Sequence, residues 1–149
     1  MLKTALAAAA LIGTLPGAAQ EDSRQYRPLN ATDETGILVS TDVAGPQTAR
    51  RFREVIVFKK RSPTGADAYV ADFAVDCPAG TITIQAAEAW QDGRMKSRFI
   101  TEPGDPERPE AGSISHDMIV YACTGESPMP EGKPVTGLPA AFALGKTLE

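Results

Sequence analysis

This chain of 149 residues has few side chains suited to chemistry, with one histidine and two cysteines. A zinc site usually takes three or four ligands, so the single His116 and two thiols leave little for one. A phosphate-binding Gly-rich motif, paired zinc-ligand spacing and a nucleophile elbow are also missing from the sequence. We therefore expect no metal site, no cofactor and no catalytic residue, and we predict that the protein is not an enzyme.

Long apolar runs are scarce too, and the longest, Thr4 to Leu15, is too short to span a bilayer. It follows a short basic start with Lys3 and precedes the small residues of Pro16 to Ala19. This order is typical of a secretory signal peptide. We predict a signal peptide over residues 1–19 and a mature chain beginning near Gln20. The alternative is a retained anchor helix.

An excess of positive charge is absent, because 15 basic and 19 acidic residues give a net charge of −4. A mildly acidic protein has no overall attraction to nucleic acid or to anionic lipid. We expect neither a nucleic-acid partner nor a membrane-spanning segment. The signal peptide places the protein in the periplasm, at the cell surface or in the medium.

The two cysteines, Cys77 and Cys123, are expected to form one disulfide, because exported proteins fold in an oxidising compartment. A metal pair and a catalytic thiol are the alternatives. The enclosed loop is long, so the chain-entropy argument predicts about 4 kcal/mol of stabilisation, less any strain.

The stretch from Tyr69 to Trp90 predicts two strands joined by a tight turn at Pro78 and Gly80. Apolar and polar residues alternate in its first half, which is typical of a half-buried strand. The packed face would carry Tyr69, Ala71, Phe73, Val75 and Cys77. A helix that covers this face could then be tied to Cys77.

Further strands are predicted on either side of this hairpin. They are Tyr26 to Leu29 as a short edge strand, Gly36 to Ser40, Arg53 to Lys59 as a central strand buried on both faces, and Met95 to Ile100 after an Asp92-Gly93 turn. A helix should follow Ser113 and end before Gly125, with His116, Ile119, Val120 and Cys123 on one face.

The predicted fold is α+β, a mainly antiparallel sheet of about five to six strands with one short C-terminal helix tied to it by the disulfide. A single domain would cover residues 20–125. Residues 126–149 form a Pro/Gly-rich C-terminal extension, in which Leu138 to Leu144 is open between strand and helix.

The order of these parts resembles the surface-adhesin protein E-like family of small exported bacterial proteins. The matching residues lie within 26–125 and are Tyr26-Arg27-Pro28-Leu29, Ile37 to Asp42, Val55 to Lys59, Val75-Asp76-Cys77-Pro78-Ala79-Gly80, Gly93 and the helix with Cys123. The resemblance implies one antiparallel sheet with a C-terminal helix held to its concave side by a disulfide. It also implies binding of host matrix proteins through exposed charged segments.

A basic cluster brackets the predicted central strand and is the candidate ligand-binding patch. Its members are Arg50, Arg51, Arg53, Lys59, Lys60 and Arg61. Basic residues at both ends of one strand could mark two loop patches for an acidic ligand or a glycan. The alternative interpretation is that these charges only maintain solubility.

Other candidates are interpreted as structural. Asp72 and Asp76 would lie about 13 Å apart on one strand face, which is wide for a glycosidase pair. His116 has no partner at a spacing that would make it a general base. The acidic loop Thr101 to Gly112 lacks the spacing of an EF-hand. We expect Trp90 to be partly in the core.

The leading hypothesis is an exported, non-enzymatic envelope protein that acts as a binding or adhesin-like module for an envelope or host-matrix protein. The alternative is a small periplasmic inhibitor of an envelope-directed enzyme such as lysozyme. An inhibitor of this kind would need one protruding loop, and residues 101–112 are the candidate. An enzyme would need an apolar groove with converging polar side chains.

Overall fold

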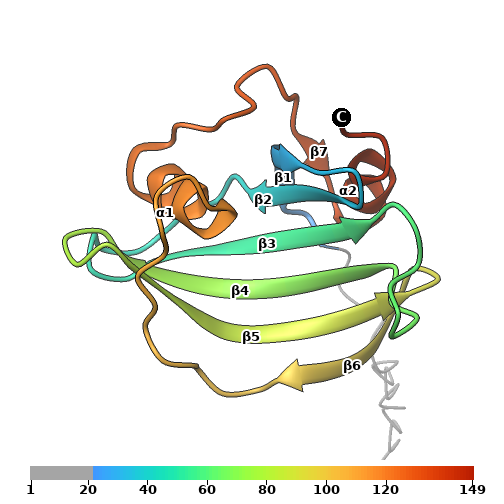
Figure 1. The fold of residues 1–149 in the computed structure, drawn as a ribbon, viewed down its shortest axis with the longest axis horizontal. Coiled ribbons are helices and arrows are strands. Elements are labelled where there is room, and N and C mark those ends of the chain that lie inside the picture. The colour runs from blue at the N-terminus through green and yellow to red at the C-terminus, as the bar shows by residue number, and fades with distance from the viewer. Residues whose placement is uncertain (1–21) are drawn as a thin grey trace, which may run out of the picture.

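A computed structural model describes residues 22–149, and the predicted signal peptide lies outside this range. One antiparallel sheet holds seven strands in the order β6-β5-β4-β3-β2-β1-β7 (Figure 1). The elements are β1 (Gln25–Ala31), β2 (Thr35–Ser40), β3 (Arg50–Phe58), β4 (Ala68–Asp76), β5 (Thr81–Gln91), β6 (Arg94–Ile100), α1 (Ile114–Thr124), β7 (Val135–Thr136) and α2 (Leu138–Gly145).

The α+β fold class is confirmed, and the Cys77–Cys123 disulfide links the sheet to α1. The structure adds a two-residue strand and a second helix, both within residues 126–149. Because β7 pairs with Gln25 and Tyr26, β1 is not an edge strand at its start, and that part of the prediction is wrong.

The two helices cover opposite faces of the sheet. Ile37 and Val39 of β2 pack in the cluster that includes α1, whereas Leu38 between them packs in the cluster that includes α2. Successive side chains of a strand point to opposite faces, so we refer to an α1 face and an α2 face. The helices also lie at opposite ends of the strands, α1 near the start of β3 and α2 near its end (Figure 1).

Strand β4 is buried from both sides, whereas the alternation of its apolar and polar residues predicts burial of one face only. Val75 packs under α1 with Phe73 and Cys77 beside it, whereas Val70 packs under α2. The second helix covers the face that the sequence had assigned to solvent. The central strand β3 is covered from both sides as expected, because Phe52 belongs to the α1 cluster and Val55 to the α2 cluster.

Helix α1 begins and ends where the sequence predicted. The Ser113 side chain accepts a hydrogen bond from the His116 amide, and Gly125 ends the helix at φ 78°. The buried residues, however, are Met118, Ile119, Tyr121 and Ala122, so the predicted face with His116 and Val120 is wrong. The helix has apolar residues around most of its circumference, and the Tyr121 hydroxyl donates to the Ser40 carbonyl, which fixes the orientation.

Helix α2 approaches the backbone of β2 because two glycines face each other. A Cβ atom on Gly36 would lie 2.0 Å from the carbonyl oxygen of Gly145. Gly145 in turn lies against the Val57 side chain, and Leu138 and Ala141 are buried in the same cluster. The C-terminal segment therefore completes one half of the core.

Gly36→Ala should destabilise the fold by about 2 kcal/mol or more, because the added methyl group overlaps backbone atoms that cannot move aside. Gly104→Ala is the matched control, since its Cβ would meet only Ile84, the Cγ2 atom at 3.2 Å and the carbonyl oxygen at an ordinary 3.9 Å. Urea unfolding of both variants measures the difference. Equal stabilities would contradict the close approach of α2.

Cys123→Ser should lower the melting temperature by an amount comparable to reduction of the wild type. The two cysteines are 46 residues apart, and closing a loop of that length is worth about 4 kcal/mol in the chain-entropy argument. Melting curves with and without reductant measure this. A wild-type curve that reductant leaves unchanged would contradict a stabilising role.

Candidate functional site

The end of the α2 face that α2 leaves uncovered is an open polar groove of about 370 Å³. We call it the arginine groove. Its charged and hydroxyl lining residues are Arg24, Ser40, Asp42, Arg51, Arg53 and Asp72. They come from the segment before β1, the end of β2 and the segment after it, the first half of β3 and the middle of β4.

Arg53 and Asp72 form a two-pronged ion pair across neighbouring strands. They are paired in the β3–β4 register, and the Nε and terminal nitrogen of Arg53 donate to the two carboxylate oxygens at 2.8 and 3.0 Å. The hydrogen bond to Asp72 raises the pKa of Arg53 further above its usual range. The Arg53 guanidinium is thus charged and held in one orientation.

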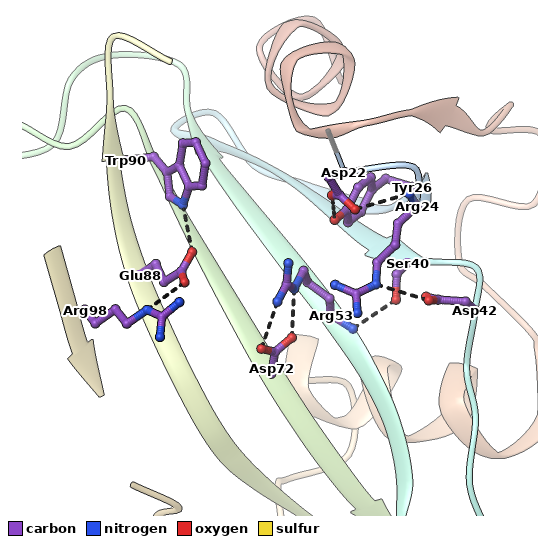
Figure 2. A network of polar contacts seen from close by, with 10 residues as sticks. All are labelled: Asp22, Arg24, Tyr26, Ser40, Asp42, Arg53, Asp72, Glu88, Trp90 and Arg98. Atoms are coloured by element: carbon purple, nitrogen blue, oxygen red, sulfur yellow. Dashed lines mark hydrogen bonds and ion pairs between the residues drawn. The ribbon is translucent and has the colours of Figure 1, made fainter. Parts of the chain in front are cut away.

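Tyr26 of β1 pairs with Ser40 of β2, beside Arg53 in the sheet. Its side chain is fully buried, and its hydroxyl donates to the Asp22 carboxylate. Burial, assisted by Asp22, raises the pKa of the Tyr26 phenol well above its ordinary value. The Ser40 hydroxyl accepts a hydrogen bond of 2.9 Å from the Arg53 amide (Figure 2). The Ser40 bond joins β2 to β3, and the Tyr26–Ser40 register joins β1 to β2, so the three strands meet at the groove.

The second ion pair of the groove joins Arg24 and Asp42, at 3.1 Å. Neither residue was predicted from the sequence, although the β1–β2 hairpin offered a signal. In an antiparallel hairpin the start of the first strand lies beside the end of the second, so residues flanking these two ends meet. Arg51, in contrast, is exposed and has no carboxylate partner among residues 22–149.

The arginine groove contains only Arg51 and Arg53 of the six predicted basic residues. Arg50 points to the α1 face, where it donates to the carbonyls of Ala122 and Gly45 at 3.2 and 2.9 Å. It therefore acts as a clamp between β3 and α1. The alternation along β3 separates Arg50 from its neighbour Arg51.

The other three basic residues lie past the far end of β3, and Lys59, the first of them, is about 20 Å from Arg53 by strand rise. The Lys59 ammonium donates to the Thr32 carbonyl at 2.6 Å. Arg61 is paired with both Asp67 and Asp92. The structure thus separates the six residues into two groups, and several of them already form hydrogen bonds or ion pairs within the chain.

The buried carboxyl group of Glu54 lies outside the arginine groove. Only 5% of the residue is exposed, and burial raises its pKa to about 7. Glu54 follows Arg53 in β3, so its side chain points to the opposite, α1 face. The group with a pKa near neutrality therefore does not face the polar groove.

The remaining candidates have structural contacts. His116 is half-buried in α1 behind its cap Ser113. Asp76 accepts a hydrogen bond from the Ala79 amide in the β4–β5 turn. Trp90 is half-buried as expected, with its ring 5.5 Å from Phe142 and its Nε1 donating to Glu88.

The acidic loop, residues 101–112, runs along the edge of β5. The Gly104 amide donates to the Ile84 carbonyl, and Glu107 and Ile82 exchange two backbone hydrogen bonds, all at 2.9 Å. Its residues are nearly all exposed, as the sequence predicted. These three bonds hold the loop against the sheet.

No protein-family model, curated protein or solved structure matches this chain. The resemblance to the surface-adhesin protein E-like family therefore stays a prediction. Within residues 22–149, no helix is long and apolar enough to cross a membrane. In the same range, no three His, Cys, Asp or Glu side chains are grouped so that they could hold a metal ion.

Glu54→Gln should remove a pH dependence of stability. The Glu54 carboxyl has a pKa of about 7 in the folded state and an ordinary pKa in the unfolded state. Its contribution to stability is therefore complete below the unfolded pKa. Between the unfolded and the folded pKa, the folded state keeps the proton whereas the unfolded state loses it. Stability therefore falls as the pH rises toward 7, by up to about 3 kcal/mol.

Urea unfolding of wild type and Glu54→Gln at pH 4.5, 5.5, 6.5 and 8 measures this effect. The glutamine variant should gain stability relative to the wild type as the pH rises. Parallel pH profiles for the two proteins would show that the buried carboxyl does not titrate in this range.

Proposed function

We propose that this chain is an exported, non-enzymatic envelope protein that binds an acidic surface of an envelope or host-matrix protein through the arginine groove. Export is supported by the signal-peptide pattern of the sequence and by the disulfide, which persists in oxidising compartments. The adhesin-like role is supported by the arrangement of charge in the groove.

The observation that carries the proposal is the environment of Arg51. Its guanidinium is exposed at the groove without a carboxylate partner among residues 22–149. A guanidinium offers a planar set of donors that matches a carboxylate in a bidentate arrangement. Arg51 is therefore available to a carboxylate of a partner protein.

Two further arginines of the groove are already oriented. Arg24 is held by Asp42 and Arg53 by Asp72 (Figure 2). Side chains that are ordered before binding lose less entropy when the partner arrives. The lining thus has three arginines against two aspartates, a local excess of positive charge on an acidic protein.

The same geometry favours binding over catalysis. The Asp42 and Asp72 carboxylates of the groove are both in ion pairs with arginine. A general base needs a pKa near the working pH and a position within hydrogen-bond reach of its target. Glu54 has such a pKa but is buried on the other face.

Lysozyme-type inhibition has less support. That function needs a loop that inserts a side chain into an enzyme cleft, and the acidic loop is bonded along β5 by three backbone hydrogen bonds. Its prolines and acidic side chains remain on the surface. We therefore keep binding through the arginine groove as the proposed function.

Arg51→Glu should weaken capture of an acidic partner at least tenfold, roughly the effect of exchanging an attractive charge for a repulsive one at an interface. Lys60→Glu makes the same change of charge at the far end of β3 and serves as the control. The immobilised wild-type protein would be exposed to envelope extract and to purified matrix proteins. The affinity of each captured protein is then measured for both variants.

Equal losses in the two variants would show that only overall charge matters. An affinity that Arg51→Glu leaves unchanged would exclude the arginine groove as the binding surface.

A further inference from the structure

Strand β6 is a free edge of the sheet and lies at the bottom of the view in Figure 1. Residues Arg94 to Phe99 are all exposed. Within residues 22–149, the backbone of β6 is hydrogen-bonded to β5 only. The opposite edge is the two-residue strand β7. A long free edge is a template for the addition of another strand.

The side chains of β6 carry charge of one sign. Arg94, Lys96 and Arg98 alternate with uncharged residues, and no acidic residue lies between Gly93 and Thr101. Arg98 is paired with Glu88 at 3.1 Å. Arg94 and Lys96 have no carboxylate partner in the described part of the chain. An added strand would therefore meet two available cations.

An apolar groove of about 360 Å³ borders this edge on the α1 face. Its lining includes Tyr69, Ala89, Lys96 and Phe99. The Tyr69 and Phe99 rings lie 5.3 Å apart, and Phe99 is 53% exposed. Tyr69 lies near the start of β4, and Val75, which α1 covers, lies near its end. The groove is therefore about 20 Å along the strand from that helix.

We propose that β6 docks an extended, acidic segment of a partner protein by strand addition. The segment would form main-chain hydrogen bonds with β6, place carboxylates beside Arg94 and Lys96, and pack an apolar side chain against the Tyr69 and Phe99 rings. This inference goes beyond the proposed function, because β6 is separate from the arginine groove. Either surface can bind without the other.

A second copy of this chain fits the edge poorly. Pairing β6 with another β6 would bring arginines and lysines of both copies together, and like charges on neighbouring strands are destabilising. The acidic loop that continues the edge contains Pro103, Pro106 and Pro109, which have no N–H to donate to a ladder. Charge and hydrogen bonding both favour an acidic segment of a different protein.

The test uses an acetylated and amidated eight-residue peptide in which glutamate and leucine occupy every second position, with threonine between them, so that both lie on the face that Lys96 and Phe99 share. We expect it to shift the amide resonances of Met95 to Ile100 and to slow hydrogen exchange of the outward β6 amides about tenfold at saturation. A peptide with N-methyl groups on alternate amides keeps the charge but cannot form the ladder. It should not bind, nor should a peptide with lysine in place of glutamate.

The double variant Arg94→Glu/Lys96→Glu should lose peptide binding, at least about tenfold in Kd, because two attractive charges become repulsive. Phe99→Ser should weaken binding through the apolar groove. Arg51→Glu is the matched control and should bind the peptide like the wild type, which separates this site from the arginine groove. Thermal melting verifies that each variant is folded, and Arg94→Gln/Lys96→Gln replaces any double variant that is not.

Three results would overturn the proposal. The first is the absence of resonance shifts in β6 at millimolar peptide. The second is equal binding of the N-methylated peptide, which would show attraction of charge without strand addition. The third is a dimer of the wild type in sedimentation that the double variant abolishes, which would make a second copy the occupant.

Discussion

A single sheet has two faces, and the apolar side chains on each must be covered by other parts of the chain. Two short helices do this here, α1 on one face at one end and α2 on the other face at the opposite end. Neither helix is long enough to cover a whole face. Two open surfaces therefore remain, one on each face, and both candidate binding surfaces of the molecule follow from this diagonal arrangement.

The residues on the two open surfaces differ in kind. On the α2 face the sheet carries paired charges such as Arg53 and Asp72, which remain partly hydrated and need no cover. On the α1 face it carries aromatic rings, and Phe99 stays largely exposed. A polar surface of this kind suits recognition of charge, whereas the aromatic surface beside a free edge suits an apolar side chain. Glu54, buried under the α1 face, is the exception to this distribution.

Local features of the fold followed directly from short stretches of sequence. The Asp92-Gly93 turn has φ values of 52° and 72°, as a primed hairpin turn requires. Ser113 and Gly125 mark the two ends of α1 as predicted. The disulfide follows from the presence of two cysteines in a chain expected to be exported. Each of these depends on the conformational preference or chemistry of a few residues.

By itself the sequence determined the fold class, the strand hairpins and helix α1, because residues close together in the chain decide backbone conformation and periodicity. It also determined the disulfide, since two cysteines allow only one intramolecular pair. The tertiary structure alone decided where α2 docks, since Gly36 and Gly145 are far apart in the sequence. It also decided that Arg51 faces the arginine groove while Arg50 clamps α1, and that Arg24 meets Asp42. Such contacts depend on which segments pack together, and no local pattern encodes that choice.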